Sequence, residues 1–84
     1  MKNVSIYTTT YCGYCKQAKH LLEAQEVPFT EIDVTEDDAK RQWLAQVTGQ
    51  RTVPQIFIGE QPIGGYTELS DLVKSHQLKP MLQD

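Results

Sequence analysis

Two cysteines placed three positions apart, Cys12 and Cys15, constrain this chain more than any other feature. They follow a short β-rich run over 4–7 and open a pattern over 13–25 in which apolar residues recur at helical spacing. The thiolate is the nucleophile in disulfide exchange, and the start of a helix offers unpaired N–H groups and partial positive charge to an anion. The pattern therefore predicts that Cys12 attacks disulfides. Cys15, one turn deeper and less acidic through burial, is predicted to resolve the product.

The cysteine pair has two other interpretations. A secreted disulfide scaffold carries more cysteines at wider spacing, and a bridge across two intervening residues constrains the unfolded chain little. A closed zinc site needs four ligands, but the remaining candidates, His20 and His76, lack the paired spacing of a zinc finger. Both histidines are predicted to be surface or partly buried packing residues. Redox chemistry is the interpretation that we favour over these two alternatives.

The hydrophobic pattern predicts strands over 4–7, 29–34, 54–58 and 61–63 and helices over 13–25, 35–48 and 67–76. Thr35 is predicted to cap the second helix, with Asp38 in the capping-box position, and Gly49 to end it. Trp43 is predicted to be core or partly buried, and Pro80 to open a short terminal turn or helix. This order predicts one α/β domain over residues 1–84, with a four-stranded mixed sheet and helices on both faces, and it resembles the thioredoxin-like layout.

The charge balance excludes some kinds of partner. The net charge is −3, and no basic stripe is present to replace the counterions of phosphates, so nucleic acid is not expected as the main partner. The apolar stretch after Met1 is too short for a signal peptide or a membrane span. We therefore expect a cytoplasmic protein that does not bind membranes.

Three motifs together resemble those of dithiol glutaredoxins, in the same order and at similar spacing. They are Tyr11-Cys12-Gly13-Tyr14-Cys15, Thr52-Val53-Pro54 and Gly64-Gly65-Tyr66-Thr67-Glu68. The resemblance implies a monomer that uses glutathione as co-substrate and a reversible Cys12–Cys15 disulfide. Its implied substrates are glutathionylated proteins and protein disulfides, such as the one formed by a ribonucleotide reductase. The glutathione-binding residues that it implies are Tyr14, Arg41, Thr52, Val53, Pro54, Gly65, Tyr66 and Thr67.

The resemblance also assigns a part of glutathione to several of these residues. It implies a cis Pro54 that lets the Val53 backbone pair with the cysteine part of glutathione, like a short added strand. The alternative is that Pro54 only opens a strand. Tyr66 and Thr67, at a helix start after two glycines, are implied to bind the γ-glutamyl carboxylate. Thr67 could equally serve only as a helix cap.

Two arginines complete the comparison with the family. Arg41 lies eleven residues before Thr52, where glutaredoxins carry a side chain that reaches the glycyl carboxylate of glutathione. The forked donors of arginine suit that task, although a solvated helix charge is the alternative. Arg51 belongs to the Arg-Thr-Val-Pro run common in the family, without a clear role.

Two positions depart from the family pattern. Thr9 stands where many glutaredoxins have a lysine that supports the thiolate and contacts glutathione, so either a less stabilised thiolate or weaker binding of glutathione is expected. Gly13 replaces the more common proline. Among relatives, a small residue there is associated with a 2Fe–2S cluster bridged between two subunits, held here by Cys12 of each subunit and two glutathiones. A cluster carrier is therefore a second hypothesis. An electron donor reduced by thioredoxin reductase is a third, against which the glutathione-side residues argue.

Overall fold

The computed structural model describes residues 1–83, which form a sheet with helices on both faces. Its elements are β1 (Val4–Thr8), α1 (Gly13–Ala24), β2 (Thr30–Asp33), α2 (Asp38–Thr48), β3 (Gln55–Ile58), β4 (Gln61–Gly64), α3 (Tyr66–Lys74) and α4 (Leu78–Leu82). The strand order is β2-β1-β3-β4, with β1 and β2 parallel and the other pairs antiparallel. This arrangement confirms the predicted four-stranded mixed sheet.

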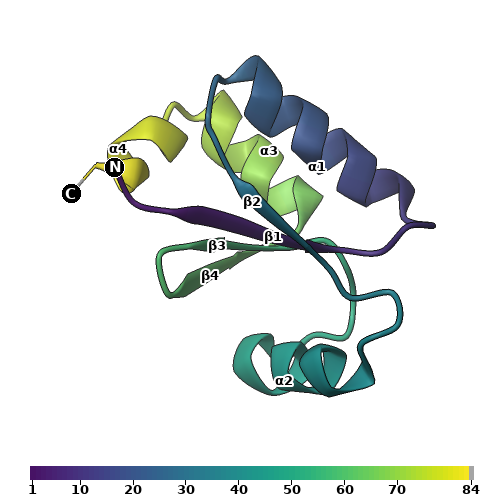
Figure 1. Cartoon of the computed structure of the whole chain (residues 1–84). Helices are drawn as coiled ribbons and strands as arrows, with labels where there is room; N and C mark the ends of the chain where they lie inside the picture. Colours follow the sequence, from purple (N-terminus) through teal and green to yellow (C-terminus); the bar gives the residue numbers. More distant parts are fainter. Residues whose placement is uncertain (84) are drawn as a thin grey trace.

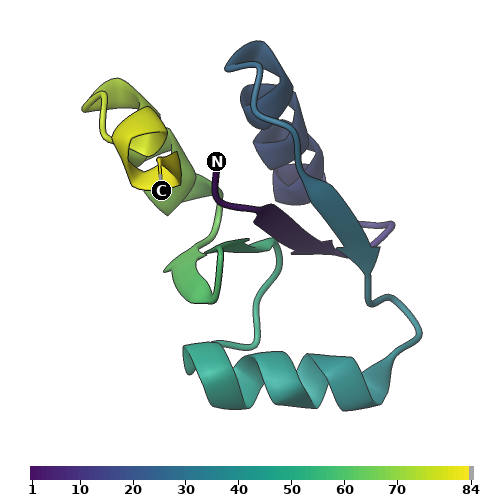
Figure 2. The same ribbon diagram turned by 60° about the vertical axis from the view of Figure 1, so that its left-hand side comes forward.

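The helices form two unequal layers. Figure 1 shows α1 and α3 together on one face of the sheet and α2 alone on the other, and Figure 2 shows the same separation after rotation. The two ends of the described chain lie at one end of the sheet, where the Lys2 N–H donates to the Leu82 carbonyl at 2.7 Å. The β1–α1 turn that carries the cysteines lies at the other end. No helix among residues 1–83 is long and apolar enough to cross a membrane.

The main core lies between the sheet and the layer of α1 and α3. Val4 and Ile6 point to this side because alternate strand residues share a face, and Ala18 and Leu22 meet them because residues four apart share a face of a helix. Each of these side chains is buried. The other buried members of this core are Val27, Ile56, Ile58, Leu69, Leu78 and Leu82. The helical period read from residues 13–25 therefore identified the buried face of α1.

The second face of the sheet has a smaller core, formed by Val34, Leu44 and Phe57. Leu44 is the one residue of α2 that is fully buried. Trp43, predicted to be core or partly buried, is exposed instead: its ring stacks on Phe57 at 5.9 Å, but 43% of the residue remains accessible to solvent. The reason is that a single helix covers this face, so side chains on the flanks of α2 remain in contact with water.

The predicted start of α2 is wrong. Asp37, not Thr35, is the N-cap, because its carboxylate accepts the Lys40 N–H at 3.0 Å. The Thr35 hydroxyl donates instead to Asp33 at 2.6 Å and accepts the Thr10 N–H at 2.9 Å. Thr35 therefore joins the loop before α2 to the loop before α1.

Other boundaries differ by a few residues. Gly49 ends α2 in the left-handed conformation with φ 74°, as predicted. The last long helix, α3, begins at Tyr66 and ends at Lys74, two residues before the predicted end. The short terminal helix α4 begins at Leu78, before Pro80, which occupies its first turn.

Candidate functional site

Cys12 is the N-cap residue of α1, with extended backbone angles (φ −102°, ψ 113°). Its Sγ accepts the Cys15 N–H at 3.1 Å, the bond that a capping side chain makes to the third residue of a helix. Sulfur accepts such a bond more strongly as a thiolate, and the helix dipole acts in the same direction. The half-buried Cys12 is therefore placed to act as a nucleophile.

Cys15 lies one turn deeper and is 1% exposed. Burial, and after it the contact with Cys12, together raise the pKa of the Cys15 thiol to about 12. The Thr9 N–H, which donates to the Cys15 sulfur, partly opposes this shift. Both cysteines are reduced, and at neutral pH Cys15 is a protonated thiol.

Val53 and Pro54 face the cysteines from the other side. The Val53–Pro54 peptide bond is cis, as the family resemblance implies. The Cys12 thiol donates a long hydrogen bond to the Val53 carbonyl, with sulfur and oxygen 3.4 Å apart. A segment 41 residues further along the chain thus lies against the candidate nucleophile.

A groove of about 230 Å³ adjoins this contact, and we call it the cysteine groove. Its lining residues are Tyr14, Gln50, Thr52, Val53, Pro54, Gly65, Tyr66, Thr67 and Glu68. The fold thus brings together seven of the eight predicted glutathione-binding residues, all except Arg41. Gln50 and Glu68 were not predicted as site residues. Glu68 was visible in the third motif, whereas no motif drew attention to Gln50.

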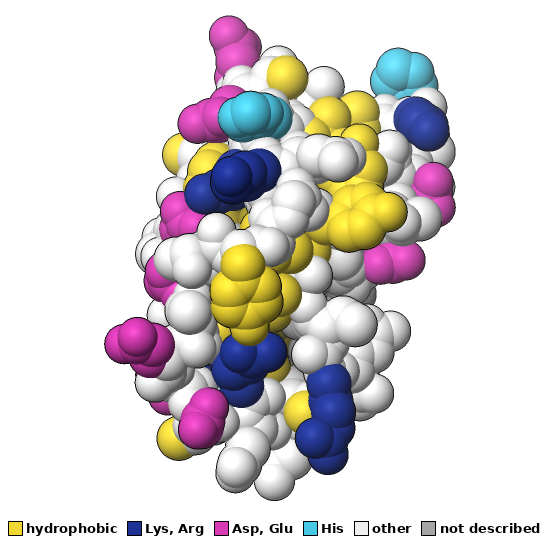
Figure 3. Space-filling model, turned by 90° about the vertical axis from the view of Figure 1, so that its right-hand side faces the viewer, with side chains coloured by type: hydrophobic (Ala, Val, Ile, Leu, Met, Phe, Trp, Pro, Cys, Tyr) yellow, Lys and Arg dark blue, Asp and Glu magenta, His cyan; other side chains and the backbone are white. Residues whose placement is uncertain are grey.

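Two tyrosines form one wall of the cysteine groove. The rings of Tyr14 and Tyr66 are stacked, with their centroids 6.1 Å apart and an angle of 30° between their planes. Figure 3, which views the molecule from the end where the β1–α1 turn lies, shows hydrophobic side chains gathered near the centre, with Lys and Arg side chains above and below them. The groove therefore offers apolar contact at its wall and polar backbone groups from the segments around Val53 and Gly65.

At the start of α3, one backbone N–H group already donates to a side chain of the protein. The Glu68 carboxylate accepts the Gly65 N–H at 2.7 Å. Gly64 has φ 111°, and a Cβ placed on it would lie 2.6 Å from Glu68 Oε1, so this close return of the side chain requires glycine. A ligand carboxylate at α3 would therefore use the N–H groups of Tyr66 and Thr67, which lack intrahelical acceptors in the first turn.

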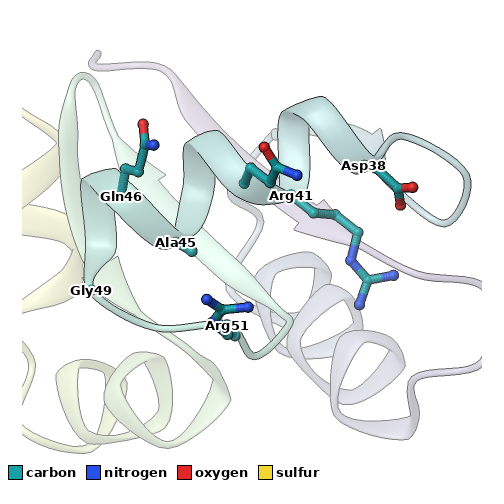
Figure 4. A pocket seen from close by; sticks show the side chains of 7 residues that line it. Asp38, Arg41, Ala45, Gln46, Gly49 and Arg51 are labelled. Carbon is teal, nitrogen blue, oxygen red and sulfur yellow. The ribbon is translucent and has the colours of Figure 1, made fainter.

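Arg41 does not line the cysteine groove. It lines a separate hollow of about 650 Å³, here called the α2 hollow, together with Asp38, Gln42, Ala45, Gln46, Gly49 and Arg51 (Figure 4). Its Nη1 donates to the Tyr11 hydroxyl at 3.1 Å, and Tyr11 directly precedes Cys12. Arg41 is thus held beside the cysteine groove through Tyr11, not within it.

Thr9, the position where the family usually has lysine, is 4% exposed. Its hydroxyl has no hydrogen-bond partner among residues 1–83.

Lys19 of α1 forms an ion pair with Glu31 of β2 at 3.0 Å, and Glu31 also accepts a hydrogen bond from the Thr8 hydroxyl at 2.7 Å. These two hydrogen bonds, that of Thr8 first, hold the pKa of the Glu31 carboxyl below its usual range.

The zinc alternative finds no ligand set in the described part of the chain. Among residues 1–83, no three His, Cys, Asp or Glu side chains gather in an arrangement suited to a metal ion. His20 and His76 are both exposed. Cys12 and Cys15 are left as a pair of thiols, which is the arrangement that disulfide exchange requires.

Comparison with known proteins finds one family throughout. The glutaredoxin family model matches residues 4–63. Over 83 residues the chain is 43% identical to glutaredoxin 3 of Escherichia coli, covering 99% of this chain and 100% of that protein. It is also 43% identical to a glutaredoxin of Pseudomonas aeruginosa, with 98% of each chain covered.

Two solved structures show the same fold. A buckwheat glutaredoxin–glutathione complex superposes with a TM-score of 0.90 at 36% identity, covering 96% of this chain and 76% of that chain. The holo form of glutaredoxin C1 from Populus tremula x tremuloides superposes with a TM-score of 0.89 at 35% identity, covering 99% and 78%. The predicted thioredoxin-like layout is thus confirmed.

Proposed function

This chain belongs to the glutaredoxin family and is a glutathione-dependent thiol–disulfide oxidoreductase, and from that premise we propose that Cys12 attacks disulfides and Cys15 resolves them. The observation that carries this assignment is the 3.1 Å hydrogen bond from the Cys15 N–H to the Cys12 sulfur. It holds the Cys12 sulfur at the N-terminus of α1, beside the thiol that would resolve its mixed disulfide. The raised pKa of the Cys15 thiol, caused first by burial, keeps Cys15 protonated at neutral pH, so Cys12 is the thiol that attacks the substrate first.

Reduction of a glutathionylated protein needs Cys12 alone. The Cys12 thiolate attacks the glutathione sulfur, a Cys12–glutathione disulfide forms, and the protein thiolate leaves and takes a proton from water. A second glutathione, as thiolate, attacks the glutathione held on Cys12. Oxidised glutathione is released, and the Cys12 thiolate is restored.

Reduction of a protein disulfide uses both cysteines. Cys12 opens the disulfide and becomes linked to one of its sulfurs, while the other sulfur leaves as a thiolate. Cys15 then loses its proton and attacks the Cys12 sulfur, which frees the substrate as a dithiol and leaves a Cys12–Cys15 disulfide. Two glutathiones reduce this disulfide and leave as oxidised glutathione.

Glutathione is the co-substrate, and the cysteine groove is the site that we propose for it. The buckwheat relative forms a complex with glutathione, which supports this assignment. The Val53 backbone would pair with the cysteine part, and Tyr66 and Thr67 would receive the γ-glutamyl carboxylate. Tyr14, Thr52, Pro54 and Gly65 would shape the groove around them. Arg41 would leave Tyr11 to reach the glycyl carboxylate.

The proposal also covers the domain, the oligomeric state, the compartment and the protein substrates of the enzyme. We infer a single glutaredoxin domain over residues 1–84, monomeric and cytoplasmic, that transfers electrons from glutathione to disulfides. Its protein substrates would include glutathionylated proteins and a ribonucleotide reductase of the disulfide-forming kind. Glutaredoxin potentials near −200 to −230 mV lie close to that of the glutathione pool, which would allow glutathione to recycle this enzyme.

The experiment that tests this proposal is glutathione-dependent reduction of a small glutathione mixed disulfide. Wild type is compared with Cys12→Ser and Cys15→Ser. We expect Cys12→Ser to be inactive and Cys15→Ser to keep substantial activity. Comparable loss in both variants would contradict the division of labour, and an inactive wild type would contradict the glutathione site.

A 2Fe–2S cluster bridged between two chains is a second candidate function. One observation favours it, because nothing lies within 4 Å of a Cβ built on Gly13, so the space beside the half-buried Cys12 is open. Cys12 of each chain and two glutathiones would supply the four sulfur ligands. Anaerobic purification with glutathione would give a coloured dimer that Cys12→Ser abolishes and Cys15→Ser retains. A colourless monomer from wild type would contradict this candidate.

A further inference from the structure

Two arginines and one acidic residue, Asp38, line the α2 hollow. Arg41 and Arg51 have no ion-pair partner among residues 1–83. Figure 4 shows both side chains on the same side of α2, Arg41 reaching out from the helix and Arg51 from the loop that follows it. In a chain whose net charge is −3, two unpaired guanidinium groups in one hollow form a locally basic surface.

The chemistry of the guanidinium group defines what this surface can bind. Arginine presents its donors in a planar fork that matches a carboxylate in shape and charge. Asp38, the one acidic residue of the α2 hollow, lies in the first turn of α2, where the helix dipole favours a negative charge, and it forms no ion pair with either arginine. Gln42 and Gln46 add neutral hydrogen-bonding groups. The hollow therefore suits an acidic side chain at its Arg51 end.

The α2 hollow adjoins the place where disulfides are exchanged. Arg41 is bonded to Tyr11, the residue before Cys12. Arg51 directly precedes Thr52 and Val53, which line the cysteine groove. A polypeptide whose cysteine is disulfide-bonded to Cys12 must extend over one of the flanks of the site, and the α2 hollow forms one of these flanks.

The other flank of the cysteine groove, at the start of α3, carries negatively charged side chains. At the start of α3, Glu68 lines the cysteine groove, and Asp71 follows one turn later, exposed to solvent. An acidic polypeptide would be repelled from this flank and attracted to the flank of Arg51, because both electrostatic effects act in the same direction. Charge complementarity thus selects both the flank and the kind of partner.

We propose that the α2 hollow docks an acidic side chain of the protein substrate, located a few residues from the cysteine that reacts with Cys12, with Arg51 as its main contact. The proposal rests on the proposed function and adds a preference among protein substrates to it. Arg41 has a separate role in our assignment of the glutathione site, so the test is built on Arg51 alone.

The test compares two peptides, each with one intramolecular disulfide, that differ only in a Glu or a Gln placed within three residues of one of their two cysteines, in a series of positions. The ratio of their kcat/KM values is measured for wild type, Arg51→Gln and Arg51→Glu. The matched control is Lys79→Glu, which changes the net charge as much as Arg51→Glu does but lies on α4, at the far end of the molecule. A glutathione mixed disulfide of free cysteine, which has no flanking polypeptide, measures the basal reaction.

We expect wild type to favour the Glu peptide at one position by about 2- to 5-fold, the size of a partly exposed ion pair, and less at high salt. Arg51→Gln should remove the preference, Arg51→Glu should reverse it, and Lys79→Glu should leave it intact. All variants should reduce the small substrate at the wild-type rate. Equal rates for the two peptides, or an equal effect of Lys79→Glu, would overturn the docking proposal alone. Failure of wild type on the small substrate would overturn the proposed function as well.

Discussion

The Cys15 N–H lies 3.1 Å from the Cys12 sulfur and donates a hydrogen bond to it, while the side chain of Cys15 is buried beneath. Cys15 thus has two roles, one for its backbone N–H and one for its thiol. Its backbone stabilises the attacking sulfur, and its thiol waits to resolve the mixed disulfide. Because the two tasks belong to the backbone and the side chain, replacing the thiol leaves the stabilising N–H in place.

The first prediction concerns alkylation. With a pKa of about 12, Cys15 is ionised in only about one molecule in 100,000 at pH 7, and it is buried as well. Brief treatment of the reduced protein with iodoacetamide should therefore modify Cys12 alone, as mass spectrometry of the peptides would show. In urea both cysteines should react. Equal labelling of the two cysteines in the folded protein would refute this reading of the site.

The second prediction concerns stability at alkaline pH. The pKa of Cys15 is raised in the folded protein, from an ordinary value near 9 to about 12, so the folded state holds a proton that the unfolded chain loses. The contribution is complete below about pH 9 and is lost as pH rises toward 12, with a slope of at most about 1.4 kcal/mol per pH unit. Urea unfolding of the reduced protein at pH 8 and pH 10 measures it.

Tyrosine and lysine side chains also titrate in that range, so the control for this slope is the Cys15→Ala variant. It lacks the thiol, and its stability should fall less steeply between the two pH values than that of wild type. Identical slopes in the two proteins would mean that Cys15 ionises at its ordinary pKa.

The third prediction compares two adjacent threonines. The Thr9 hydroxyl is buried without a partner among residues 1–83, whereas the equally buried Thr8 hydroxyl donates to Glu31 at 2.7 Å. Thr9→Val should raise the free energy of unfolding by about 1–3 kcal/mol, because it removes a desolvated polar group. Thr8→Val should lower it by about 1–3 kcal/mol, because it deletes a bond to a charged group. Urea midpoints check both signs, and destabilisation by Thr9→Val would show that its hydroxyl has a partner in solution.

The fourth prediction tests the place of Arg41 in the glutathione site. Arg41→Leu should raise the KM for glutathione by about 3- to 10-fold with little change in kcat, because the contact is made equally in the ground and transition states. Tyr11→Phe removes the hydroxyl that holds Arg41 at 3.1 Å and should leave KM at or below the wild-type value. An unchanged KM in Arg41→Leu would mean that Arg41 serves only the α2 hollow.

Much of the fold could be predicted from local patterns in the sequence. The helical spacing of apolar residues over 13–25 predicted α1, whose buried face carries Ala18 and Leu22, and Gly49 predicted the end of α2, because helical period and left-handed glycine caps are properties of a few neighbouring residues. The cap of α2 was assigned wrongly because Thr35, Asp37 and Asp38 are all acceptable capping residues. Thr35 is held instead by Thr10, from a distant loop, and sequence pattern does not reveal such a contact.

The sequence by itself determined which groups could carry the chemistry, since the positions of Cys12 and Cys15 at the start of a helix follow from residues within one short segment. Only the tertiary structure decided what surrounds them. It set the Val53 carbonyl against the Cys12 sulfur, left Arg41 beside the cysteine groove, and placed Arg51 in the same hollow as Arg41. These relations join residues far apart in the chain, and they depend on how the sheet and α2 pack, which local spacing does not encode.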